Sequence, residues 1–189
     1  MMKRSMTLLS LMALPVTVLA DGFDYTYVEA GFVNSEIDVG PFDVDGDGFG
    51  LSGSFALSDS IHLIGSYSDQ DYDFGVSADT LKLGGGFNTS LNSDLDFVAQ
   101  LAYYDVEVSS GFGNADDDGL GVGAGIRARP APDLELDAGL TYVDLDDSDT
   151  VINLGIRYYF SDTFALAGGL VDDDSGLSWS IGVRAEFGQ

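Results

Sequence analysis

The most specific chemical motif in this sequence is a short acidic repeat that begins at Asp43. Asp43, Asp45 and Asp47 occupy alternate positions and Gly48 follows, which is the D-x-D-x-D-G opening of a calcium-binding loop. In such a loop the alternate carboxylates turn toward one centre and the glycine permits a sharp bend. Ser54 stands where an EF-hand has its bidentate glutamate. Two interpretations stay open, a calcium site and a solvated acidic segment suited to a salty medium.

Residues that could serve an enzyme are few. His62 is the only histidine. It stands at the start of one of the strands expected below, beside a turn that we expect on the periplasmic side, and therefore far from the outer opening of the expected barrel. Asp71 and Asp73 could activate water near that mouth, but acidic residues without a positive partner are more simply solvated. The chain has no cysteine, which excludes thiol catalysis, disulfides and a lipoprotein anchor. We therefore expect no catalytic residues and a non-enzymatic protein that requires no cofactor.

A third group of charged residues lies in segments where polar and apolar residues alternate. In a strand, the charged residues would share one face and the apolar residues the other. This group contains every Lys and Arg that follows residue 20. Buried charges are stable only when they are paired or hydrated, so the pattern predicts an ion-pair network inside a lumen. Inward glycines leave room for these long side chains or for water, and a plugged lumen is favoured because small barrels enclose little else. The set is Glu29, Lys82, Asp96, Arg127, Arg129, Glu135, Asp137, Arg157, Arg184 and Glu186.

The elements that must position these charges are strands. In the segment 120–129, leucine, valine, isoleucine and alanine alternate with glycine and arginine, so one face suits lipid and the other a lumen. Similar segments have the length of about 9–11 residues that crosses a bilayer. The sequence therefore predicts an all-β, antiparallel, up-and-down transmembrane β-barrel of ten strands. We expect them at about 24–33, 48–57, 61–70, 79–89, 94–106, 119–129, 134–144, 149–160, 163–172 and 176–187.

The connections between these segments alternate in length. Turns at 58–60, 90–93, 130–133 and 161–162 are expected at the periplasmic end, because bacterial barrels keep their short turns there. The connections at 34–47, 70–78, 106–118, 145–148 and 173–175 are expected as extracellular loops. Aromatic residues on the apolar face fall near both ends of the strands, which predicts the two aromatic girdles of a membrane barrel.

The beginning of the chain has the order of a secretory signal peptide. Lys3 and Arg4 precede an apolar stretch from 6 to 19, and Ala20 offers a small-residue cleavage site. We expect a signal peptide at 1–20 and one barrel domain at 21–189. The expected location is the outer membrane of a Gram-negative bacterium, and the last strand resembles the C-terminal signal that the barrel assembly machinery reads.

Net charge is the strongest departure from a plain barrel. The formal net charge is −25, and 21 of the 32 acidic residues lie in the expected outer loops and adjacent strand ends, where no Lys or Arg occurs. The electric field of so many acidic residues repels nucleic acid and concentrates cations. Divalent ions that bridge the loops or lipid headgroups would relieve the repulsion. The expected partners are outer-membrane lipids and lipopolysaccharide, around a monomeric barrel.

Three functions remain in order of preference. The first is a structural or surface-interaction barrel whose acidic loops bind divalent cations. The second is a narrow cation-preferring diffusion pore, although positive side chains in the lumen argue mildly against it. The third, a lipid-modifying enzyme, would need an activity that depends on Asp71, Asp73 or Asp118.

Several runs of the sequence resemble a known group. YTYVEAGFVN at 25–34, DGDGFGLSGS at 45–54 and IHLIGSY at 61–67 resemble the small outer-membrane barrels linked to biofilm and vesicle phenotypes in xanthomonads. The whole chain is more distantly similar to porin-like and OmpA-like membrane domains. The resemblance implies an integral outer-membrane protein and brings no catalytic residues.

Overall fold

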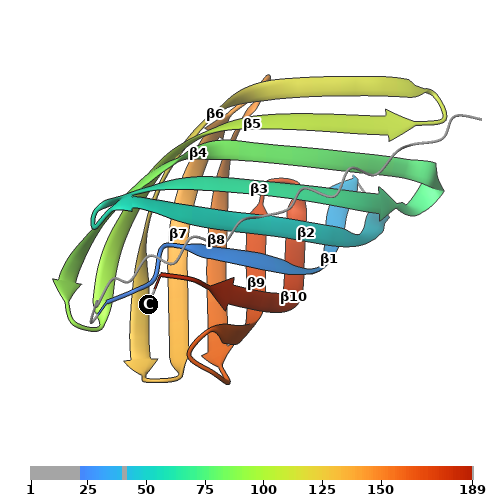
Figure 1. Ribbon diagram of the computed structural model, residues 1–189. Helices are drawn as coiled ribbons and strands as arrows, with labels where there is room; N and C mark the ends of the chain where they lie inside the picture. Colours follow the sequence, from blue (N-terminus) through green and yellow to red (C-terminus); the bar gives the residue numbers. More distant parts are fainter. Residues whose placement is uncertain (1–21, 40–41, 189) are drawn as a thin grey trace, which may run out of the picture.

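The computed structural model describes residues 22–39 and 42–188, and the expected signal peptide at 1–20 lies outside them. Ten antiparallel strands form a closed barrel in which each strand pairs with its neighbours in sequence and β1 pairs with β10 (Figure 1). This confirms the predicted fold class. The strands are β1 Tyr27–Val39, β2 Phe42–Ser58, β3 Ile61–Tyr72, β4 Val76–Asn92, β5 Leu95–Ser110, β6 Gly113–Ala131, β7 Leu134–Asp144, β8 Ser148–Tyr159, β9 Phe164–Asp173 and β10 Gly176–Glu186. In the described part of the chain, no helix is long and apolar enough to cross a membrane.

We call the end of the barrel that holds both ends of the described chain the terminal end, and the opposite end the distal end. The four turns expected at the terminal end are short, as predicted. The β3–β4 and β5–β6 hairpins reach far toward the distal end, at the right of Figure 1, whereas the C-terminus lies at the left. The distal strand ends therefore form an uneven wall that is higher along β1–β6.

The predicted distal loops at 34–47, 70–78 and 106–118 are wrong, because most of these residues continue the strands. The β5–β6 ladder, for example, runs without interruption to the pair of Ser110 with Gly113. The β3–β4 connection is only a 3-10 turn at Asp73–Gly75. Aspartate and glycine suggested turns, but valine and isoleucine between them keep the alternation, and pairing within a hairpin supplies hydrogen bonds for both strands.

The two faces of the barrel wall follow the predicted alternation. On β8, Ile152, Leu154 and Ile156 are exposed on the outer face, whereas Asn153 and Arg157 point inward and are partly covered. Outward aromatic rings gather near both ends of the strands, and the Phe32 ring lies 6.4 Å from Phe49 and 5.8 Å from Trp179. The outer surface therefore has the apolar band and aromatic ends that a bilayer requires.

Small inward residues make room for large ones on the next strand. A side chain on Gly86 would overlap the His62 ring, and one on Gly121 would overlap Tyr104. Ala165 and Ala167 are also buried inward-facing residues of β9. The interior is thus filled by long polar side chains between glycines and alanines, in place of an apolar core.

Candidate functional site

The terminal half of the lumen contains a continuous series of ion pairs. Arg127 on β6 binds Glu135 on β7, with 2.9 Å between Nε and Oε2, and Arg129 binds the other oxygen of Glu135 at 2.6 Å. The Glu135 side chain is fully buried. The tight β6–β7 turn brings these three residues together, because both strands place alternate residues inward. Two guanidinium groups therefore compensate one carboxylate that has left water.

A second cluster continues this series on the other side of the lumen. Arg184 on β10 binds Glu29 on β1 at 2.8 Å, and Arg157 on β8 binds Asp137 on β7 and lies 3.5 Å from Glu29. Glu186 connects the two clusters, because its carboxylate lies 3.4 Å from Arg127 and 3.8 Å from Arg184. Strands β1, β6, β7, β8 and β10 are thereby held together through charged side chains.

Eight residues of the predicted lumen set join these ion pairs. They are Glu29, Arg127, Arg129, Glu135, Asp137, Arg157, Arg184 and Glu186. The two remaining members have other partners. Asp96 accepts a hydrogen bond from the Tyr25 hydroxyl at 2.9 Å, and Lys82 donates to the amide oxygen of Gln100 at 3.1 Å.

The segment before β1 crosses the terminal end of the lumen, a feature that the sequence reasoning missed. We call residues 22–26 the N-terminal plug. The Arg127 guanidinium lies 5.1 Å from the centres of both the Phe23 and Tyr25 rings, and Arg129 lies 4.8 Å from the Phe23 ring. Such cation–π contacts strengthen when they are shielded from water. The same arginines therefore hold the strands together and hold the plug in place.

Hydrogen bonds fix the plug at several points. Arg127 Nη1 donates to the Asp24 carbonyl at 2.6 Å, and the Asp24 carboxylate accepts from the Thr26 and Gly188 amides, each at 2.6 Å. The Tyr25 ring stacks on His62, with ring centres 4.7 Å apart. Burial raises the pKa of the Tyr25 hydroxyl, which keeps it protonated as a donor to Asp96. The predicted start of the first strand at residue 24 is therefore wrong, because residues 24–26 belong to the plug.

His62 lies in the lumen, as expected, and is buried. Its Nδ1 is 3.1 Å from the Asn88 amide oxygen and its ring is covered by Tyr25. Asp71 is exposed on the outer face of β3, and Asp73 lies in the exposed turn that follows. These candidate acid–base residues are separated along the length of β3, so they do not form one catalytic group.

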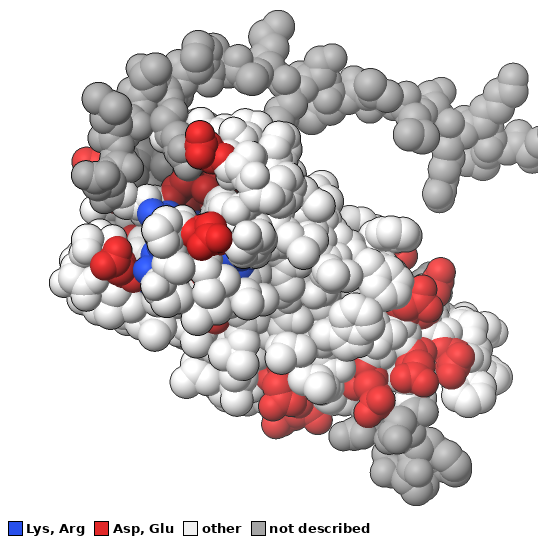
Figure 2. Space-filling view, turned by 90° about the horizontal axis from the view of Figure 1, so that it is seen from below, with Lys and Arg blue, Asp and Glu red and all other residues white. Residues whose placement is uncertain are grey.

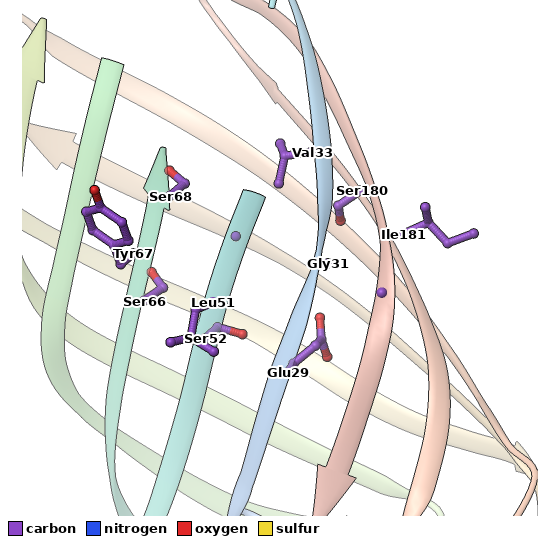
Figure 3. A pocket seen from close by; sticks show the side chains of 12 residues that line it. Glu29, Gly31, Val33, Leu51, Ser52, Ser66, Tyr67, Ser68, Ser180 and Ile181 are labelled. Atoms are coloured by element: carbon purple, nitrogen blue, oxygen red, sulfur yellow. The ribbon is translucent and has the colours of Figure 1, made fainter. Parts of the chain in front are cut away.

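Beyond the plug, the lumen holds a cavity of about 380 Å³. Its wall includes Lys82, Gln100, Tyr104, Asn153 and Arg157. A smaller pocket of about 160 Å³ lies along β1, β2, β3 and β10. Figure 3 shows Ser66 and Ser68 on β3 beside Ser52 on β2 and Glu29 on β1. The lumen is therefore plugged at one end and holds open space, with both polar and apolar residues on its wall, farther along.

The acidic motif at 43–48 forms part of β2 and is not a loop. Asp45 and Asp47 are exposed, and the side chain of Asp43 lies outside the described part of the structure. In an extended strand, carboxylates two residues apart share a face but do not converge. Within residues 22–39 and 42–188, no three His, Asp or Glu side chains are grouped to hold a metal ion. Calcium binding by Asp43, Asp45 and Asp47 stays a prediction.

Most acidic residues of the distal strand ends face away from the lumen. Asp69 shares a strand face with the outward-facing Tyr67, and Asp47 shares one with Phe49. Many stand directly opposite another carboxylate, as in the pairs Asp69–Asp79 and Glu107–Asp116. We call the following ten residues on β1–β6 the acidic belt: Glu36, Asp45, Asp47, Asp69, Asp71, Asp79, Asp105, Glu107, Asp116 and Asp118.

The space-filling view shows the same separation of charge. In Figure 2, acidic residues stand without basic neighbours toward the lower right, whereas Lys and Arg atoms are visible only at the left, among acidic residues. A ladder of like charges on neighbouring strands is unfavourable unless water, salt or counter-ions screen it. The belt therefore places like charges side by side on neighbouring strands, without a basic residue between them.

Comparison with known proteins agrees with this geometry. The model of the outer membrane protein beta-barrel domain matches residues 6–160, so the chain belongs to that family. An outer membrane channel from Pseudomonas putida F1 has 12% identity and a TM-score of 0.56, over 87% of this chain and 96% of that one. The KdgM porin has 10% identity and a TM-score of 0.50, over 86% and 99% of the two chains.

A third similar structure is Ail, the attachment invasion locus protein of Yersinia pestis. It has 17% identity and a TM-score of 0.45, over 86% of this chain and 97% of that one. At these identities the likenesses to the Pseudomonas channel and the KdgM porin show the fold alone. No curated protein sequence matches the chain. Family membership makes this an outer-membrane β-barrel of the Gram-negative cell envelope.

Proposed function

We propose that this protein is a closed, non-enzymatic barrel that stabilises the cell surface by binding divalent cations of the lipopolysaccharide layer through its acidic belt. One observation carries the proposal: the belt carboxylates lie on the lipid-facing side of the wall, directly beyond outward aromatic residues such as Tyr67 and Tyr103. Aromatic rings settle at the height of lipid headgroups. With the terminal end in the periplasm, the belt meets the outer headgroups.

Divalent cations are the chemistry that this position demands. Lipopolysaccharide phosphates and belt carboxylates are both anionic, so they repel one another unless a cation lies between them. Calcium and magnesium prefer oxygen ligands and accept them from more than one molecule. A cation shared between a belt pair such as Glu107–Asp116 and a lipid phosphate would remove the repulsion between the two carboxylates and the repulsion between the carboxylates and the phosphate. The barrel would then be cross-linked to its lipid shell.

The test compares calcium dependence in two lipid environments. Folded protein is placed in vesicles with and without lipopolysaccharide, and the urea midpoint of unfolding is measured in calcium and in EDTA. We expect calcium to raise the midpoint more when lipopolysaccharide is present, and Glu107→Gln/Asp116→Asn to reduce that increase. Asp59→Asn/Asp94→Asn, which removes exposed acids at the terminal end, is the matched control. An equal calcium effect in both double variants would contradict the proposal.

The original calcium motif can be tested in the same measurement. If Asp43, Asp45 and Asp47 form a separate site, calcium raises the midpoint without lipopolysaccharide, and Asp45→Asn removes the increase. If the belt acts only with lipid phosphates, calcium has little effect in vesicles that lack lipopolysaccharide.

A narrow pore is the second candidate, and the cavity beyond the plug is the observation that favours it. Conductance across a planar bilayer distinguishes the two. We expect the wild-type protein to be silent, because Phe23 and Tyr25 close the terminal end of the lumen. Phe23→Ala/Tyr25→Ala should produce discrete current steps. Reproducible, cation-selective steps from the wild-type protein would make it a pore and replace the closed-barrel proposal.

A further inference from the structure

Lys82 differs from every other cation in the lumen. Arg127, Arg129, Arg157 and Arg184 each bind at least one carboxylate. Among the described residues, Lys82 forms no ion pair and has one hydrogen-bond acceptor, the amide oxygen of Gln100 at 3.1 Å. An ammonium group has three N–H donors, and a charge away from bulk water is costly without a counter-charge.

The surroundings of Lys82 hold it in place without neutralising it. Gln100 Nε2 donates to Thr141 Oγ1 at 3.4 Å, which orients the Gln100 amide with its oxygen toward Lys82. The Nζ atom also lies 5.5 Å from the centre of the Tyr104 ring, a weak cation–π contact. Two N–H donors of Lys82 therefore remain for a group that the protein does not supply.

The space for such a group is next to Lys82. The cavity of about 380 Å³ is lined by polar residues that include Lys82, Gln100, Thr141 and Asn153, by Asp137 in its ion pair with Arg157, and by apolar residues such as Val98 and Val151. The Nε atom of Arg157 is buried and makes no hydrogen bond, although Glu29 lies 3.5 Å away. One wall of the cavity thus has an uncompensated ammonium group, whereas the Arg157 Nε atom is fully buried beside Glu29.

We propose that Lys82 binds a small monovalent anion, a halide or a short carboxylate, in the lumen cavity. The ammonium group supplies the charge, and the Asn153 amide and Thr141 hydroxyl, which also line the cavity, can donate hydrogen bonds. A single charge suits the site because only one cation there lacks a carboxylate. Larger polyanions do not fit, because the plug closes one end and the space is limited.

The acidic belt does not prevent this binding. Its carboxylates face outward, away from the lumen, and exposed charges are screened beyond about 8 Å at physiological salt. The anion is a resident counter-ion of the barrel interior, with no need for transport through it. The proposal is therefore independent of the surface role of the belt.

The first experiment locates the anion directly. Crystals of the folded protein are grown in sodium bromide, and the bromide is identified by anomalous scattering. We expect a peak beside Lys82 Nζ, somewhat farther away than the ~2.7–2.9 Å of a charge-assisted N–H···O contact because bromide is larger than oxygen. When the same crystals are transferred to sodium formate, we expect formate to displace the bromide, so that planar carboxylate density takes the place of the anomalous peak. Wild-type crystals in bromide with only water beside Lys82 would overturn the proposal.

Variants separate a built site from chance occupancy. Lys82→Met keeps the length of the side chain and removes its charge, so the bromide peak should disappear. Lys82→Arg keeps the charge and should retain the peak, and Ser66→Ala, on the neighbouring strand, is the control for a change in lumen polarity. A bromide that persists at this place in Lys82→Met would also overturn the proposal. The shift in electrophoretic mobility on heating checks that each variant has folded. If a variant has not folded, the wild-type crystals in bromide alone test the proposal.

Discussion

The two ends of this barrel treat charge in opposite ways. At the terminal end, acidic residues meet arginines inside the lumen, and Glu135 is fully buried between two of them. At the distal end, the residues of the acidic belt face outward. The sequence has no Lys or Arg from Glu36 to Asp79 or from Asp105 to Asp118. The arginines thus pair with carboxylates inside the lumen, whereas the acidic residues of the belt lie on the outer surface.

This difference indicates where stability and function reside. Buried pairs are scarcely affected by salt, and removal of one partner leaves a charge stranded in a medium of low polarity. Exposed carboxylates are screened by salt and contribute little individually. Variants at the terminal end should therefore change the folding of the barrel, and variants at the distal end should change its response to ions.

The largest expected effect follows from loss of Arg127. Arg127→Met leaves Glu135 with one cation and Glu186 with a distant one, and it removes the contacts of the plug with Phe23 and Asp24. Removal of one member of a buried ion pair costs about 3–5 kcal/mol. We expect a loss of this order in the free energy of unfolding, measured with urea in lipid vesicles.

Arg129→Met is the matched control for this variant. Its side chain is 27% exposed, against 7% for Arg127, although both bind Glu135. We expect a clearly smaller loss of stability. Equal losses in the two variants would show that the ion pairs act as one unit, and the larger effect expected for the more buried Arg127 would be wrong.

An intermediate effect is expected at the plug. Tyr25→Phe keeps the ring that stacks on His62 and removes only the hydroxyl that donates to buried Asp96. Hydrogen bonds to charged groups contribute about 1.5–3 kcal/mol. The same urea measurement should show a loss in this range, and amide exchange of residues 22–26 should accelerate. Unchanged exchange would mean that the remaining contacts of the plug, with Arg127, Arg129 and His62, hold it without this hydrogen bond.

The fold could be predicted from the sequence because a membrane barrel repeats one simple pattern. Leu120, Val122 and Ile126 against Gly121, Gly123 and Arg127 show the lipid face and the lumen face without further information. The same alternation placed eight members of the ion-pair network on the inward side. The pairs between neighbouring strands, such as Arg127–Glu135, are close in sequence. The pairs Arg184–Glu29 and Arg127–Glu186 join strands that lie far apart in sequence, and the alternation carries no signal for those.

The plug and the belt were missed for different reasons. Residues 24–26 continue the alternation of β1, so nothing local shows that the chain leaves the sheet to cover Arg127. The belt residues follow the strand pattern as well, but aspartate and glycine are rare in strands, and this favoured loops. Pairing across a long hairpin overrides that preference. As a result, carboxylates expected in extracellular loops are instead presented on the outer wall of the strands.

The smallest expected effect tests whether the belt carries the unrelieved repulsion that its register implies. Glu107 and Asp116 stand opposite each other on β5 and β6, and both are exposed. Glu107→Gln/Asp116→Asn should raise the urea midpoint slightly in low salt with EDTA, because repulsion between opposed like charges is removed. The gain should shrink as sodium chloride screens the belt of the wild-type protein. Asp59→Asn/Asp94→Asn should show no such dependence, since those two residues are not opposed. If the belt variant gains nothing in low salt, the carboxylates have already found counter-ions or spread into water, and the contrast between the two ends of the barrel would be one of location without an energetic consequence.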